Sequence, residues 1–160
     1  MKLTDLLLRH PFADAEALVH TIDRSVTKAQ LVADARRVCD ALGDVQHAAV
    51  AVQLPDGPEL IAAMFGVWLA GGVYVPVNSR YPMAEVEHII KLTRTAALMN
   101  EEGVRRCDDP VAYDDDVAFV LWTSGTTGTP KPIQQTHGGY LEFLDRVLGP
   151  LRAADRKSVV

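Results

Sequence analysis

The sequence predicts an α/β fold in which helices flank a mostly parallel β-sheet. Two observations predict it. Short runs that are apolar on both faces, at residues 48–54, 73–77 and 117–122, are typical of strands buried in a parallel sheet. Segments with helical features separate these runs, and such alternation requires crossover connections between parallel strands. The 160 residues, 48% of them hydrophobic, suffice for one domain with a substantial core.

The first helix is expected to begin at Thr27, after a short strand at residues 17–22. Thr27 and Gln30 fit a capping box, in which each side chain satisfies a free backbone N–H of the other residue. Apolar residues at helical spacing continue to Leu42, and Gly43 is a suitable stop.

The central part of the chain repeats the strand–helix order. Pro58 favours the first turn of a helix, which is expected over residues 58–70 and is followed by the strand at 73–77. A further helix is expected over residues 81–93, and residues 96–99 form another short strand.

Residues 100–116 interrupt this order with seven acidic residues, two arginines and little apolar material. We predict a solvated loop here. A metal site is the sharper alternative, but three of the acids are consecutive, and adjacent side chains do not converge on one ion. The sequence therefore predicts no metal ligands in this loop.

The C-terminal part returns to regular structure. It is expected to contain the strand at residues 117–122, a short strand at 133–136 and a helix at 137–148, and residues 156–160 look like the start of another strand.

Charge and composition exclude several classes of partner. A net charge of −5 argues against nucleic acid, which recruits clustered Lys and Arg, and against an anionic membrane surface. No apolar stretch reaches the roughly 20 residues of a membrane span. Cys39 and Cys107 lie far apart and resemble neither a disulfide framework nor a zinc site, so two free thiols in a reducing cytoplasm are expected.

A loop rich in glycine and hydroxyl groups follows the strand at 117–122. Its residues are Thr123, Ser124, Gly125, Thr126, Thr127, Gly128, Thr129, Pro130 and Lys131. The glycines permit a tight turn and close approach to a ligand, and successive backbone N–H groups in such a turn can point at one anion. Hydroxyl donors and the Lys131 charge suit phosphate oxygens, because hydrogen bonds to charged acceptors are about twice as strong as neutral ones. The pattern predicts a polyphosphate site that is not a Walker A loop; a flexible surface turn is the alternative.

The order of the loop residues resembles the phosphate-binding signature of adenylate-forming enzymes, which include acyl-CoA synthetases, adenylation domains of nonribosomal peptide synthetases and luciferases. The match extends to Lys131, and Pro132 stands where glycine is usual. Residues 69–78, with the following Tyr81 and Pro82, resemble the family's earlier core motif. The segment at 136–139 is similar to the acyl-CoA synthetase branch.

This resemblance implies that residues 1–160 form the N-terminal part of the large domain, truncated, with the acidic loop 100–116 within it. It implies a reaction in which a carboxylate attacks the α-phosphorus of ATP, pyrophosphate leaves, and a thiol of CoA or phosphopantetheine takes the acyl group. ATP phosphates would contact Thr123, Ser124, Gly125, Thr126, Thr127, Gly128 and Lys131, with Lys131 also catalytic.

The resemblance also suggests that His137 lies near the substrate; a capping or packing role is the alternative. Mg²⁺ would accompany ATP, with its protein ligand outside this chain. Expected partners are ATP, a carboxylic acid, a thiol acceptor and the missing C-terminal portion, as a separate chain. The isolated chain is therefore not expected to complete adenylation. A fragment of a peptide synthetase adenylation domain and a non-catalytic nucleotide-binding scaffold are the alternatives to an acyl-CoA synthetase.

Overall fold

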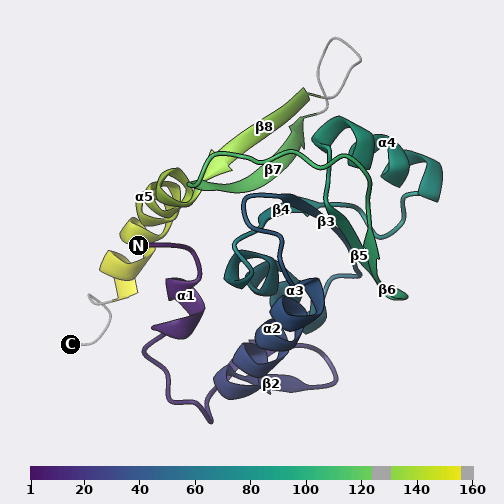
Figure 1. Cartoon of the computed structure of the whole chain (residues 1–160). Helices are drawn as coiled ribbons and strands as arrows, with labels where there is room; N and C mark the ends of the chain where they lie inside the picture. Colours follow the sequence, from purple (N-terminus) through teal and green to yellow (C-terminus); the bar gives the residue numbers. More distant parts are fainter. Residues whose placement is uncertain (124–130, 156–160) are drawn as a thin grey trace.

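The computed structural model describes residues 1–123 and 131–155 (Figure 1). Its centre is a six-stranded sheet with the order β6-β5-β3-β4-β7-β8. The four inner strands run parallel to one another: β3 (Ala49–Gln53), β4 (Val73–Pro76), β5 (Ala97–Asn100) and β7 (Val117–Thr123). The edge strands β6 (Gly103–Arg106) and β8 (Lys131–Thr136) are antiparallel to their neighbours. The predicted α/β class with a mostly parallel sheet is confirmed.

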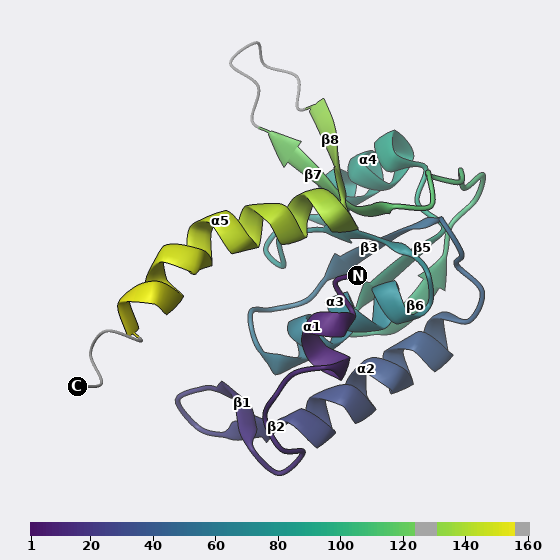
Figure 2. The same ribbon diagram turned by 90° about the vertical axis from the view of Figure 1, so that its left-hand side faces the viewer.

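Helices cover both faces of the sheet. On one face lie α2 (Lys28–Leu42) and α3 (Pro58–Leu69), and on the other lies α4 (Met83–Thr93) (Figures 1 and 2). The short helix α1 (Asp5–Leu8) and the hairpin of β1 (Ala17–His20) and β2 (Ser25–Thr27) precede them. Helix α5 (His137–Asp155) starts at the end of β8 and extends away from the body of the molecule (Figure 2). No helix in the described part of the chain is long and apolar enough to cross a membrane.

The predicted capping box at the start of α2 is present. The Gln30 backbone N–H donates to Thr27 Oγ1 at 3.2 Å, and the Thr27 backbone N–H donates to Gln30 Oε1 at 2.9 Å. The helix ends at Gly43, whose φ of 59° is in the left-handed region that favours glycine. Both boundaries were therefore set by local side-chain and backbone chemistry that the sequence displays.

Helices α2 and α3 pack closely because Gly66 has no side chain. A Cβ atom at residue 66 would lie 2.5 Å from Val38 Cβ and 2.8 Å from the backbone oxygen of Ala35. Glycine in the middle of a helix costs about 0.5–1 kcal/mol relative to alanine. The close approach of the two helices is the structural reason for a glycine at this position.

The core has two layers, one on each face of the sheet. The alternation along β3 illustrates it: Val50 and Val52 belong to the layer under α2 and α3, whereas Ala49 and Ala51 belong to the layer under α4. All four side chains are fully buried. This two-sided burial explains why the strand is a continuous apolar run in the sequence.

An aromatic cluster joins α3, the sheet and α5 within the first layer. Trp68 is buried, and its ring makes edge contacts with Tyr74, Phe119 and His137 at centroid distances of 6.3, 4.9 and 6.0 Å. Its indole Nε1 donates to the Ala118 backbone oxygen at 2.8 Å. Trp68 thus fixes α3 against β7, the strand that leads to the predicted loop.

The predicted loop at residues 100–116 was wrong in one part, because it contains β6. This strand pairs antiparallel with β5 at the sheet edge. Only Val104 of its four residues is apolar, and the other three are exposed. An edge strand that faces water on most sides lacks the apolar pattern on which the sequence prediction relied.

Other differences concern short or terminal elements. Helix α1 and strand β2 were not predicted, and α5 continues past residue 148 to Asp155. The predicted strand at 17–22 is β1, which pairs with β2 rather than with the main sheet. The strand expected at 156–160 lies outside the described residues.

Candidate phosphate-binding site

Strands β7 and β8 hold the two ends of the predicted phosphate loop side by side. The two strands are antiparallel, and Thr123 at the end of β7 is the register partner of Lys131 at the start of β8. The backbones of these two predicted site residues are therefore adjacent. The other predicted ligands, Ser124, Gly125, Thr126, Thr127 and Gly128, lie outside the described residues.

Pro132, the departure from the family signature, lies in β8 opposite Trp122. Strand β8 is the edge of the sheet, and edge strands are where sheets accept a proline, because the missing N–H need not join a ladder on both sides. Pro132 is thus compatible with the strand that carries Lys131.

A cavity of about 500 Å³ lies on the α4 face of the sheet, next to the end of β7. It is lined by residues at the ends of β4 and β7 and along α4: Pro76, Asn78, Tyr81, Glu85, His88, Ile89, Leu92, Leu121 and Trp122. In parallel α/β sheets, ligands bind outside the carboxyl ends of the strands. Strands β4 and β7 are parallel neighbours, so the cavity and the start of the loop share this edge.

The lining of this cavity is mainly apolar, with a few polar groups on one side of α4. Trp122 Nε1 is buried and has no hydrogen-bond partner among the described residues. A buried donor without a partner costs about 1–3 kcal/mol. The cavity can hold a molecule with an apolar part next to the predicted phosphate-binding loop.

The sequence interpretation did not identify the cavity residues of α4. Glu85, His88 and Leu92 are spaced by three and four positions, which places them on one face of a helix. That spacing was the available signal. It could not be used without knowing that this face of α4 borders the end of β7.

His137 lies on the opposite face of the sheet from this cavity. It is 4% exposed, and its Nδ1 accepts the Leu3 backbone N–H at 3.2 Å. Burial is the main reason that its pKa is lowered; nearby Lys2 lowers it further and Asp116 opposes the shift. Within the described chain His137 packs under the N-terminal segment, and its contact with a substrate stays a prediction.

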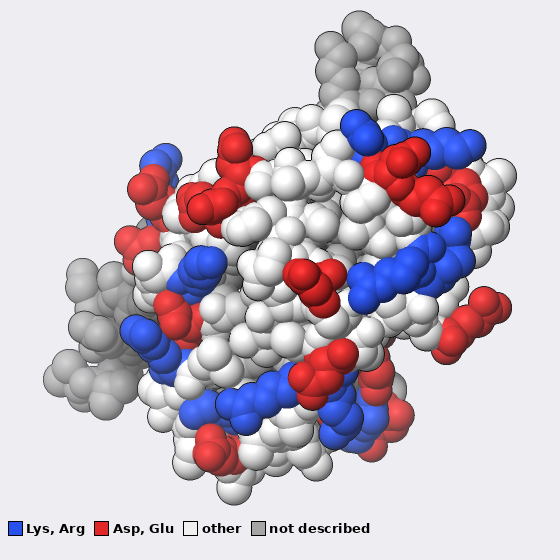
Figure 3. Space-filling model, viewed as in Figure 1, with Lys and Arg blue, Asp and Glu red and all other residues white. Residues whose placement is uncertain are grey.

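Charges of both signs are interspersed on the face of the molecule shown in Figure 3. The described residues on that face form no extended basic surface of the kind that contacts with many phosphates of a nucleic acid require. Asp115, one of the three consecutive acids, lies 3.5 Å from His47 Nδ1. The described residues contain no group of three His, Cys, Asp or Glu side chains that could hold a metal ion.

The mostly parallel sheet with helices on both faces defines the chain as an α/β protein. More specifically, the chain belongs to the family of AMP-binding enzymes, whose family model matches residues 8–112 and 95–158. The family predicted from the loop residues is thereby confirmed.

Two curated relatives illustrate the family at sequence level. The chain is 34% identical to pyochelin synthetase PchE of Pseudomonas aeruginosa (strain UCBPP-PA14), over 95% of this chain and 12% of that protein. It is 38% identical to CymA of Salinispora arenicola, a probable nonribosomal peptide synthetase, over 89% of this chain and 2% of that protein. The chain thus spans a small part of the length of these relatives.

Solved structures confirm the fold. Apo MatB from Rhodopseudomonas palustris superimposes with a TM-score of 0.76 at 20% identity, covering 95% of this chain and 38% of that chain. The N-terminal subdomain of Klebsiella oxytoca NpsA, solved in complex with 3-hydroxybenzoyl-AMSN, gives a TM-score of 0.65 at 22% identity. The match covers 85% of this chain and 41% of that chain.

Proposed function

We propose that this chain supplies the ATP phosphate-binding part of a ligase that activates a carboxylic acid as its adenylate. The observation that carries the proposal is the register pair of Thr123 and Lys131, which closes a loop of phosphate-binding composition at the carboxyl edge of the sheet. Membership of the AMP-binding enzyme family supports ATP as the bound nucleotide. The position agrees with the general location of ligands in parallel α/β sheets.

In this proposal the loop holds the β- and γ-phosphates while a carboxylate oxygen forms a bond to the α-phosphorus. The bond from the α-phosphorus to the bridging oxygen breaks, and that oxygen leaves with pyrophosphate. Hydroxyl and backbone donors of the loop, together with the Lys131 ammonium, stabilise the charge that develops on pyrophosphate. Such positioning and electrostatic stabilisation provide most of the catalysis in phosphoryl chemistry.

A Mg²⁺ ion bound to ATP would neutralise part of the phosphate charge. The described residues do not offer a cluster of carboxylates for it, so we assign no metal ligand to this part of the chain.

The thiol that receives the acyl group has two candidates. A phosphopantetheine arm on a carrier is favoured by the likeness to a probable nonribosomal peptide synthetase at 38% identity. Coenzyme A is favoured by the sequence Thr136-His137-Gly138-Gly139 after the loop. Offering both acceptors to an acyl-adenylate-loaded protein, and measuring which thioester forms, distinguishes the two.

Titrating ATP into the chain by calorimetry tests the phosphate site. We expect the variant Lys131→Ala to bind ATP at least tenfold more weakly than the natural chain, equivalent to about 1.4 kcal/mol. Lys91→Ala is the matched control, because Lys91 is an exposed lysine in the last turn of α4. Equal ATP affinity of the Lys131→Ala and Lys91→Ala variants, or no ATP binding by the natural chain, would refute the proposal.

A further inference from the structure

A second cleft lies at the carboxyl edge of the sheet, on the face opposite the cavity described above. It has a volume of about 780 Å³ and lies between α2, the start of α3 and the ends of β3 and β5. Its position separates it from the candidate phosphate site, which lies at the ends of β4 and β7 on the α4 face. We call it the α2–α3 groove.

The floor of the α2–α3 groove is apolar. Val38, Leu54 and Met99 are half-buried there, and Ala62 is buried beneath them. An apolar floor bordered by charged groups is the usual composition of a surface that receives another protein, with an apolar centre and a polar rim.

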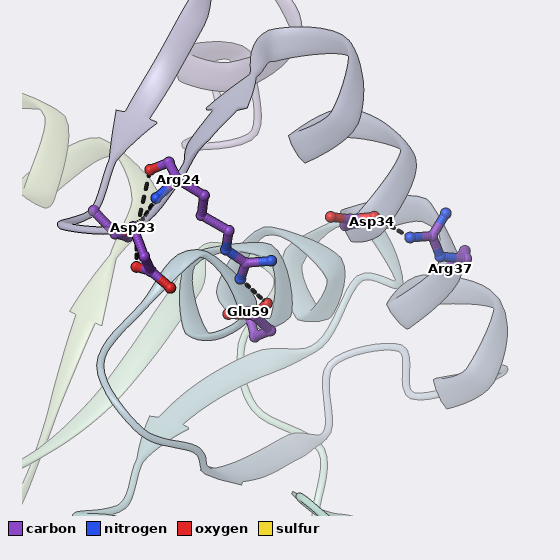
Figure 4. A network of polar contacts seen from close by, with 6 residues as sticks. Asp23, Arg24, Asp34, Arg37 and Glu59 are labelled. Atoms are coloured by element: carbon purple, nitrogen blue, oxygen red, sulfur yellow. Dashed lines mark hydrogen bonds and ion pairs between the residues drawn. The ribbon is translucent and has the colours of Figure 1, made fainter.

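Two arginines on the rim already have acidic partners within the chain. Arg24, in the turn between β1 and β2, is paired with Glu59 of α3, and Arg37 is paired with Asp34 one turn earlier in α2 (Figure 4). Figure 4 shows each guanidinium directed at its own carboxylate. These two pairs leave no net charge on their part of the rim.

Two further carboxylates on the rim have no such partner. Asp56, after β3, and Glu101, after β5, line the groove. Both are exposed, and neither forms an ion pair or a side-chain hydrogen bond with the described residues. The groove therefore combines an apolar floor with two negative charges that the chain itself does not neutralise.

We propose that the α2–α3 groove binds a segment of a partner protein in which an apolar side chain is flanked by lysine or arginine. The apolar side chain covers Val38, Leu54 and Met99, and the cations pair with Asp56 and Glu101. An apolar anchor supplies most of the affinity of such an interface, whereas complementary charge selects the partner and speeds association. An acidic segment is repelled by the same two carboxylates.

The test uses two short peptides of opposite charge. The probe is the acetylated and amidated tripeptide lysine-leucine-lysine, and the control peptide replaces both lysines with glutamate. NMR titration of the methyl-labelled chain follows the signals of Val38, Leu54 and Met99. We expect these signals to shift with the basic peptide at millimolar concentration and not with the acidic one.

A double variant distinguishes peptide binding in the groove from nonspecific attraction to the negative charge of the chain. Asp56→Asn with Glu101→Gln removes both unpaired charges, and Asp40→Asn with Asp108→Asn changes the net charge equally at exposed positions outside the groove. Each exposed ion pair contributes modestly to affinity, so we expect roughly tenfold weaker peptide binding by the first variant and unchanged binding by the second. Absence of shifts at the three methyl groups, equal binding of the two peptides, or equal weakening in both variants would overturn the proposal.

Discussion

The close contact of α2 with α3 at Gly66 makes a quantitative prediction for the variant Gly66→Ala. The added methyl group would lie 2.5 Å from Val38 Cβ and 2.8 Å from the Ala35 backbone oxygen. Carbon atoms attract each other best at about 3.5–4.0 Å, so the two helices must separate by roughly 1 Å. Such overpacking costs about 1–3 kcal/mol, and the better helix propensity of alanine returns about 1 kcal/mol.

We therefore expect Gly66→Ala to lower the free energy of unfolding by up to about 2 kcal/mol, or the melting temperature by up to roughly 8 °C for a domain of this size. Urea denaturation followed by circular dichroism measures it. Gly138→Ala is the matched control, because a Cβ atom there meets only Asp116 Oδ2, at an ordinary 3.8 Å. If Gly66→Ala is more stable than the natural chain, as the higher helix propensity of alanine alone would make it, and Gly138→Ala is no less stable than the natural chain, the helices do not approach as described.

Three further predictions concern buried or capping side chains. Burial holds the pKa of His137 below the usual 6.5; because the unfolded chain takes up this proton more readily, the free energy of unfolding falls as the pH drops below about 6.5. Urea midpoints at pH 7.5 and 5.5 should therefore differ less in His137→Gln than in the natural chain. Burial raises the pKa of Tyr74 from 10.0 to about 12, so the free energy of unfolding falls as the pH rises through this interval. Titration of the natural chain, followed by absorbance at 295 nm, should show a late-titrating phenol that is missing from Tyr74→Phe. Thr27→Ala removes the capping box and should cost about 1 kcal/mol in urea denaturation, whereas Thr27→Ser should keep most of it.

Features set by neighbours in the sequence were predicted well. The capping box of Thr27 and Gln30 depends on a few adjacent residues, and the runs that became β3, β4 and β7 are apolar because both faces of the sheet are covered. Strand β6 escaped prediction because an exposed edge strand needs only one apolar residue, Val104. Its pairing with β5 comes from the chain reversal that follows β5 rather than from its composition.

The candidate site likewise has one part that the sequence predicted and one part that it did not. The ends of the loop, Thr123 and Lys131, were predicted from the order of residues in one segment. The cavity beside them joins β4, α4 and β7, and it exists only because β7 pairs with β4 instead of with β5. The order of strands in a sheet is a property of the whole fold, so no local pattern indicates which segments will share a cavity.

The hydrogen bond from the Leu3 backbone N–H to His137 has a consequence for the order in which the chain can fold. The two residues are 134 positions apart, and Leu3 and Leu7 are buried in the completed molecule. Contacts between such distant residues form late, because the loss of chain entropy comes before the contact is made. During synthesis, at about 5–20 residues per second, Leu3 must wait at least several seconds until His137 has been made. Leu3 is thus made long before His137 and is among the last residues of this chain to reach its place.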